Sequence, residues 1–131
     1  MRLWEEIVTR VTIESSLDPS KRIETDALVD TGSYMMILPS AWRNRLGEFR
    51  KCDEIEIPLA NEQTVMGTVC GPVLLQIPGF RQISSEVLFM DMHPANGEYE
   101  PLIGYITLEQ SQAAVDRVGH RLTHIRHVDV K

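Results

Sequence analysis

Apolar and polar residues alternate with a period of two along most of this chain, which predicts strands rather than helices. In residues 7–29 a run of turn-forming residues, Leu17-Asp18-Pro19-Ser20, interrupts the alternation, so this region is predicted to form a hairpin. Further strands are predicted at residues 34–38, 55–59, 64–69, 73–77 and 83–92, with a second hairpin over residues 113–130 that turns at 116–119. Six to eight short strands with closely spaced turns are typical of an all-β sandwich or barrel.

Two short segments are predicted to form helices. Ser40 can cap a helix over residues 41–46, and Gly47 stands where such a helix would end. A second short helix is predicted over residues 106–110. The predicted fold class is therefore all-β, a small closed barrel or sandwich with one or two short helices.

Length and charge limit the organisation and the partners. The chain has 131 residues, enough for a single domain over residues 1–131 with a real core. Its 13 Lys and Arg against 19 Asp and Glu give a net charge of -6, which argues against nucleic acid or an anionic membrane as partner. No segment approaches the roughly 20 apolar residues of a membrane helix. No apolar stretch follows Arg2, so no secretory signal is expected.

The cysteine content bears on the compartment. Cys52 and Cys70 are the two cysteines of the chain, and neither belongs to a Cys-x-x-Cys pair. Two cysteines do not make a disulfide framework, so both are expected to be reduced and mostly buried thiols. A cytoplasmic location is the resulting expectation.

The candidate chemistry lies at Asp30-Thr31-Gly32-Ser33. Apolar residues precede this run, so the carboxylate of Asp30 is expected at the end of a strand, where it can face a cleft. Gly32 lets the backbone pass close to the carboxylate, while Thr31 and Ser33 place hydroxyl and amide donors beside it. A plain Asp-x-Gly turn, in which the aspartate only hydrogen-bonds its own loop, is the structural alternative.

Four features around this run occur in the order found in a known family. They are Leu28-Val29 before the aspartate, a hairpin with a polar tip near residues 60–67, Leu102-Ile103-Gly104 late in the chain, and the helix at 106–110. Together with Asp30-Thr31-Gly32-Ser33 they resemble the retropepsin-like (retroviral-type) aspartic proteases and their single-domain bacterial members. The resemblance covers roughly residues 5–125. It implies a small closed β-barrel of that type and an aspartic endopeptidase, a hydrolase of peptide bonds.

The resemblance implies a role for each of these residues. Asp30 would be the catalytic carboxylate, and the Thr31 side chain would hydrogen-bond across a twofold axis. Gly32 would offer its carbonyl to the substrate, and the Ser33 hydroxyl would favour the ionised carboxylate, which predicts an acidic optimum. The flap and substrate-binding residues would be Ala60, Asn61, Glu62, Gln63 and Met66. The residues that support the catalytic loop would be Leu102, Ile103 and Gly104.

Catalysis of this type needs two carboxylates that share one proton around a water molecule. Asp30 is the only aspartate of the sequence that is followed by Thr-Gly or Ser-Gly, so one chain holds half a site. The resemblance therefore implies a homodimer to which each subunit contributes Asp30, with a peptide or protein as substrate and no cofactor or metal. Terminal strands at residues 4–11 and 122–130 would build the dimer sheet.

Tyr34 and Tyr105 depart from the retroviral pattern. Retroviral enzymes usually carry an acidic residue at the first position and a basic residue at the second, and these two residues pair. Both charges are missing here, so the outer subsites for the substrate are expected to differ from those of the retroviral enzymes.

Two other kinds of site receive less support from the sequence. His120, His124 and His127 would share one face of a helix, but their neighbours favour a strand, in which the last two point to opposite faces, so no metal site is predicted. Ser33 lacks a Gly-x-Ser-x-Gly elbow, which argues against a serine hydrolase. A second function stays open: a catalytically weak or inactive protease-like dimeric module that binds a partner peptide or has a regulatory role.

Overall fold

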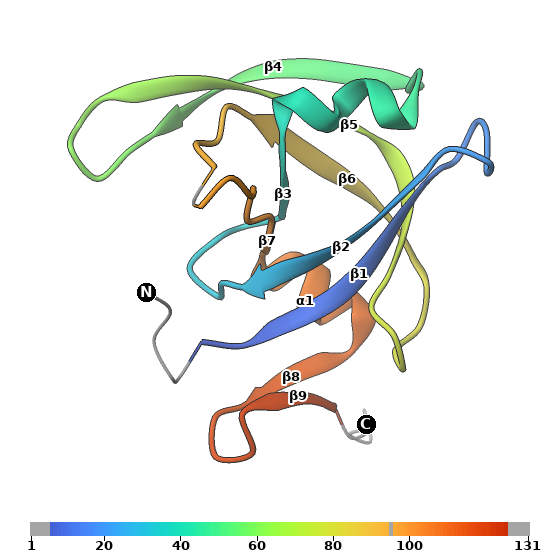
Figure 1. Cartoon of the computed structure of the whole chain (residues 1–131), viewed down its shortest axis with the longest axis vertical. Helices are drawn as coiled ribbons and strands as arrows, with labels where there is room; N and C mark the ends of the chain where they lie inside the picture. The colour runs from blue at the N-terminus through green and yellow to red at the C-terminus, as the bar shows by residue number, and fades with distance from the viewer. Residues whose placement is uncertain (1–5, 95, 126–131) are drawn as a thin grey trace, which may run out of the picture.

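The alternating segments form β-strands in the computed structural model, which describes residues 6–94 and 96–125 (Figure 1). Within these residues the strands are β1 (Val8–Ser15), β2 (Arg22–Val29), β3 (Met36–Pro39), β4 (Lys51–Pro58), β5 (Thr64–Gln76), β6 (Ile83–Met90), β7 (Leu102–Ile103), β8 (Ala113–Asp116) and β9 (Arg121–His124). Two helices join them, the 3₁₀ helix η1 (Ser40–Leu46) and the α-helix α1 (Tyr105–Ser111). The prediction of an all-β fold with two short helices is confirmed.

The strands close into a barrel. A seven-stranded sheet has the order β1-β2-β7-β3-β6-β5-β4, and β1 also pairs with β5. Because β1 pairs with both β2 and β5, the strands β1, β2, β7, β3, β6 and β5 form a closed ring. Strand β4 pairs with the other edge of β5 and lies outside this ring. The separate hairpin β8–β9 lies at the bottom of the view in Figure 1. Closure removes most of the free edges that an open sheet would expose.

The core follows from the alternation. On β1, Val11 and Ile13 are fully buried while their neighbours in the sequence are not. The other strands of the barrel contribute buried apolar side chains in the same way, because every second residue along a strand points to the same face. The largest fully buried side chains are Phe89, Ile13, Ile23, Met36, Leu38, Leu46, Leu75, Ile77 and Ile103. Their burial supplies the main stabilising term of the fold.

Several predicted boundaries differ from the observed ones. The segments predicted at 64–69 and 73–77 belong to one strand, β5, which continues through a cis Gly71–Pro72 peptide and an irregular register next to Cys70. Strand β4 begins at Lys51 rather than near residue 55, because β5 is long enough to pair with it. Ser40 lies inside η1 and makes no capping hydrogen bond, whereas Gly47 ends the helix with a φ of 73°, as predicted for a glycine stop.

The expectation of two reduced thiols is wrong. Cys52 on β4 lies directly opposite Cys70 on β5, and the two form a disulfide. Cys70 is buried, but Cys52 is exposed. Disulfides persist mainly in oxidising compartments. The cytoplasmic location was inferred from free thiols together with the lack of an expected secretory signal or membrane helix, so it loses one of its grounds and stays a prediction.

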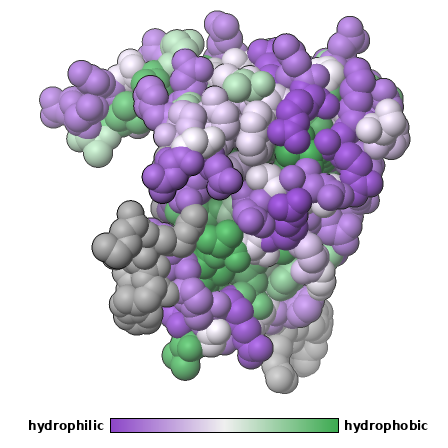
Figure 2. Space-filling model, in the orientation of Figure 1, coloured by the Kyte–Doolittle hydropathy of each residue, from purple (hydrophilic) through white to green (hydrophobic). Residues whose placement is uncertain are grey.

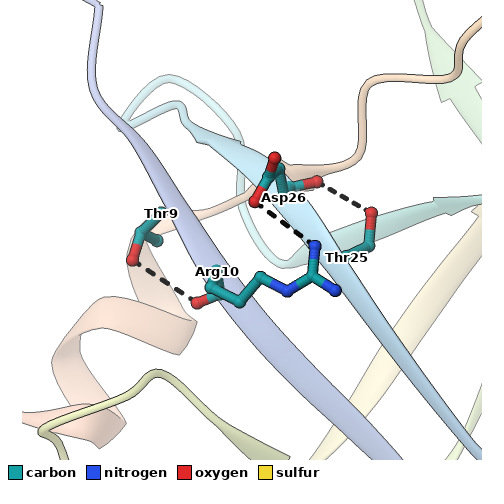
Figure 3. Close-up of polar contacts among 4 residues, drawn as sticks. All are labelled: Thr9, Arg10, Thr25 and Asp26. Atoms are coloured by element: carbon teal, nitrogen blue, oxygen red, sulfur yellow. Dashed lines mark hydrogen bonds and ion pairs between the residues drawn. The ribbon is translucent and has the colours of Figure 1, made fainter.

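The outer surface of the β1–β2 hairpin is polar. Arg10 and Asp26 lie opposite each other, and the guanidinium Nη1 lies 3.5 Å from the carboxylate Oδ1 (Figure 3). The two side chains are 53% and 72% exposed, so this ion pair contributes little to stability. None of the helices in residues 6–94 and 96–125 is long and apolar enough to cross a membrane.

Candidate active site

Strand β2 delivers Asp30 to one end of the barrel. The backbone N–H of Leu28 donates to the carbonyl of Pro101 at 2.8 Å, and that of Asp30 donates to the carbonyl of Ile103 at 2.9 Å. These bonds belong to the parallel pairing of β2 with β7, which also contacts β3 on its other side. The chain that follows Asp30 therefore leaves β2, loops out and returns as β3 with β7 between the two strands (Figure 1).

The carboxylate of Asp30 is held by its own loop. The backbone N–H of Gly32 donates to Oδ1 at 3.0 Å, and the Ser33 hydroxyl donates to Oδ2 at 3.0 Å. A turn bond from Ser33 N–H to the Asp30 carbonyl, also 3.0 Å, closes the loop. A Cβ on Gly32 would lie 3.2 Å from Oδ1, which is a tight contact, so a larger residue would crowd the carboxylate. The side chain is only half-buried and Thr31 is exposed, so the carboxylate has a preset orientation and access to solvent.

Strand β7 and the start of α1 support this loop from behind. The N–H of Tyr105 donates to the Ser33 carbonyl at 2.9 Å, and that of Ile106 donates to the Tyr34 carbonyl at 3.1 Å. Gly104 packs against the backbone between Tyr34 and Met35, because a Cβ there would lie 2.6 Å from the Tyr34 carbonyl carbon. At Gly104, the end of the run Leu102-Ile103-Gly104, the backbone thus lies directly against the backbone that follows Asp30, with no side chain between them.

Tyr34 and Tyr105 contact each other. Their ring centroids are 5.4 Å apart at an interplanar angle of 84°, an edge-to-face arrangement that aromatic pairs favour. Tyr34 is 61% exposed and Tyr105 39% exposed. The resemblance identified these two positions as a pair of opposite charges in the retroviral enzymes, but it did not predict a contact between the two tyrosines. Their joint loss of charge was the signal that the two positions touch.

The β4–β5 hairpin projects from the barrel on the same side as the Asp30 loop (Figure 1). Its tip, at Ala60, Asn61, Glu62 and Gln63, is exposed, and the side chain of Asn61 accepts a hydrogen bond from the Gln63 N–H at 3.1 Å. Glu62 has a φ of 69°, so the turn is made without a glycine. In the described part of the chain, this tip makes no hydrogen bond with the Asp30 loop.

The projecting hairpin exposes apolar side chains on a mostly polar surface, visible at the upper left of Figure 2. Met66 on β5 is 56% exposed, and Ile55 and Leu59 are also exposed. Exposed apolar residues on an arm of this kind are typical of a surface that contacts a partner or ligand. Its closure over a substrate stays a prediction.

The remaining candidate groups lie elsewhere. Asp26 faces Arg10 on the outside of the barrel, so it does not complete a pair with Asp30. His124 on β9 stacks on Phe80, and its Nε2 lies 2.7 Å from the Gly79 carbonyl. His120 lies in the turn before β9, while His127 falls outside the described residues. Within residues 6–94 and 96–125, no group of three His, Cys, Asp or Glu side chains is arranged to hold a metal ion.

The fold is similar to that of a protein of known structure. The sequence matches neither a protein-family model nor a curated protein. Among solved structures the chain is similar to EIAV protease, solved in complex with the inhibitor HBY-793, with a TM-score of 0.58 and 23% identity. The match covers 83% of this chain and 90% of that protease. The chain therefore has a retropepsin-like fold.

Proposed function

We propose that this protein is an aspartic endopeptidase that works as a homodimer. The observation that carries the proposal is the Asp30 loop, in which both carboxylate oxygens accept hydrogen bonds from the loop, at 3.0 Å each, while the group stays open to solvent. The retropepsin-like fold and the similarity to EIAV protease support it. A plain Asp-x-Gly turn would explain the hydrogen bond from the Gly32 N–H to Asp30, but it would not explain why β7 packs behind the loop.

The proposed chemistry uses one Asp30 from each subunit. One carboxylate removes a proton from a water molecule that attacks the carbonyl carbon of the scissile peptide. The other, protonated, donates to the carbonyl oxygen, so the two aspartates together carry one proton. The resulting tetrahedral diol collapses when a proton reaches the amide nitrogen and the C–N bond breaks, which releases an amine and a carboxylic acid.

Within each chain the remaining parts have matching roles. Ser33 and the Gly32 N–H orient the carboxylate before substrate binds, which lowers the cost of reorganisation during the reaction. The substrate would bind in extended form by strand addition, below the β4–β5 hairpin. Residues 60–63 and Met66 of that hairpin would cover it and exclude water.

A peptide-library cleavage assay tests the proposal between about pH 3 and about pH 7, a range that spans carboxylate titration. Wild-type protein should cleave, and Asp30→Ala should lose cleavage by a factor of about 100 or more. Asp26→Asn is the matched control, because it also removes a carboxylate, but one that faces only Arg10. Cleavage that survives in Asp30→Ala would end the protease assignment.

Mixing experiments test the shared site. When wild-type protein exchanges subunits with a ninefold excess of Asp30→Asn, nearly every wild-type subunit has a mutant partner. Activity per wild-type subunit should then fall to about a tenth if both carboxylates are needed. Unchanged activity would show that one chain suffices, which contradicts the dimeric site.

A protease-like binding module is the second candidate. The exposed apolar side chains of the β4–β5 hairpin favour it, since they would serve peptide binding without catalysis. If the wild-type protein binds peptides but shows no Asp30-dependent cleavage, the result would favour the binding module over the peptidase.

A further inference from the structure

A pocket opens next to the Asp30 loop. It has a volume of about 520 Å³, and its walls come from five parts of the chain: the loop, β4, β5, β6 and α1. Tyr34 and Met35 belong to the loop itself, Ile55 belongs to the projecting hairpin, and Ile106 belongs to α1. A peptide held between the hairpin and the loop would therefore pass this pocket.

The pocket is mainly apolar. Val69 of β5 and Pro72 extend the wall formed by the four residues named above. Tyr34 contributes an exposed aromatic ring, whose edge-to-face contact with Tyr105 fixes its position. Walls of this composition fit the aliphatic or aromatic part of a side chain.

Glu86 of β6 is the charged residue of the lining. Its backbone and side chain lie against Gly71, where a Cβ would approach the Glu86 Cα to 3.1 Å and Cγ to 3.2 Å. None of the cations in the described part of the chain pairs with its carboxylate. On β4, which pairs with β5, Lys51 lies opposite Gly71 and pairs with Asp53 at 3.4 Å. Arg81 donates to the carbonyl of Gln110, another lining residue, at 2.8 Å. The carboxylate of Glu86 therefore has no ion-pair partner among the described residues and lies beside an apolar wall.

We propose that this pocket binds an arginine or lysine side chain of the peptide substrate; this rests on the proposed peptidase function. The apolar stem lies along Met35, Ile55 and Ile106, and the cationic head pairs with Glu86. A guanidinium also stacks favourably on an aromatic ring such as Tyr34. A purely apolar side chain would bury the carboxylate without a partner, and an acidic one would be repelled. The pocket thus makes the enzyme select basic residues beyond the scissile bond.

Binding to the Asp30→Ala variant tests the selection apart from catalysis. Fluorescein-labelled decapeptides carry arginine, citrulline, leucine or glutamate at each position in turn, and anisotropy gives Kd. Arginine should bind about tenfold more tightly than its neutral isostere citrulline at one position, as expected for one charge-assisted hydrogen bond. Glu86→Gln should reduce that ratio to about one, and Glu86→Lys should favour glutamate at the same position.

Glu24→Gln is the matched control, because Glu24 is also an exposed strand glutamate but pairs with Arg22 on β2. It should keep the tenfold ratio. A ratio of one in Asp30→Ala at every position, or a ratio that persists in Glu86→Gln, overturns the proposal. Absence of Asp30-dependent cleavage, with the Glu86-dependent ratio intact, instead overturns the peptidase function and leaves the pocket assignment standing.

Discussion

Gly104→Ala tests whether β7 positions the Asp30 loop. Gly104 packs against backbone rather than side chains. An added Cβ would approach the Tyr34 carbonyl carbon to 2.6 Å and the Met35 carbonyl oxygen to 2.7 Å, and it would also meet the Met35 nitrogen. Backbone atoms cannot rotate out of the way, so the segment from β7 to α1 must move away from the loop.

Two effects set the size of the expected destabilisation. Forcing an extra methyl group into a packed site costs about 1–3 kcal/mol. The movement also breaks the bonds from Tyr105 N–H to Ser33 at 2.9 Å and from Ile106 N–H to Tyr34 at 3.1 Å, at about 1 kcal/mol each. The free energy of unfolding should therefore fall by about 3–5 kcal/mol, a large part of the usual 5–15 kcal/mol of a domain. Cleavage should fall with it, because the loop that carries Asp30 shifts.

Urea unfolding followed by tryptophan fluorescence measures this loss. Gly97→Ala is the matched control: Gly97 has a φ of +80°, and a Cβ added there would have no heavy atom within 4 Å apart from those of its chain neighbours. It should lose only about 1–2 kcal/mol for the left-handed backbone. Gly104 has a φ of -87°, so it carries no such strain. Equal losses in the two variants would refute the role of the β7 contact, because the clash at Gly104 would then cost no more than the backbone change at an open site.

Two further predictions concern stability. The backbone N–H of Gly119 donates to Asp116 at 2.9 Å and, with a smaller effect from Arg121, lowers the pKa of Asp116 from 3.8. The unfolded state then binds more protons, so this contribution is present above pH 3.8 and is lost as pH falls through the lowered pKa. Asp116→Asn should therefore lose less stability in acid than the wild type, and parallel urea midpoints down to about pH 2 would contradict this. The Cys52–Cys70 disulfide closes a segment with a sequence separation of 18. Adding reductant to the wild type should lower the free energy of unfolding by about 3 kcal/mol, to the value of the Cys52→Ser/Cys70→Ser variant, and an unchanged midpoint would be evidence against the disulfide.

The sequence predicted the parts of the fold that depend on local chemistry. The first hairpin, the turn at residues 60–63, the Gly47 stop and the helix near residues 106–110 each follow from turn residues or alternation within a few positions. The run Leu102-Ile103-Gly104 was found through the resemblance alone. Its contacts with Tyr34 and Met35 join segments about 70 positions apart in the chain, and no local pattern encodes such a distance.

The pocket beside the loop was not predictable in this way. Its walls come from the loop, β4, β5, β6 and α1, so it exists only after the barrel has closed. Glu86 is an exposed strand residue next to the buried Val87, as many surface glutamates are, which gave no reason to single it out. Its position against Gly71 depends on the pairing of β5 with β6, whose register shifts between Cys70 and Val73.

The disulfide was missed because the two cysteines were judged by their number and spacing alone, whereas their pairing depends on the register of the β4–β5 hairpin. In the observed hairpin, Pro58 lies opposite Thr64, and the pairing continues without a shift to Lys51 and Gly71. Cys52 therefore faces Cys70. A four-residue turn at 60–63 would instead pair residues 59 and 64 and shift the whole ladder by one position. Cys52 would then face Gly71, on the opposite side of the sheet from Cys70. The Leu59–Gln63 bond of 2.8 Å makes the loop one residue longer. The turn geometry therefore decides the redox chemistry of the hairpin, and with it which side chains of β4 face the pocket.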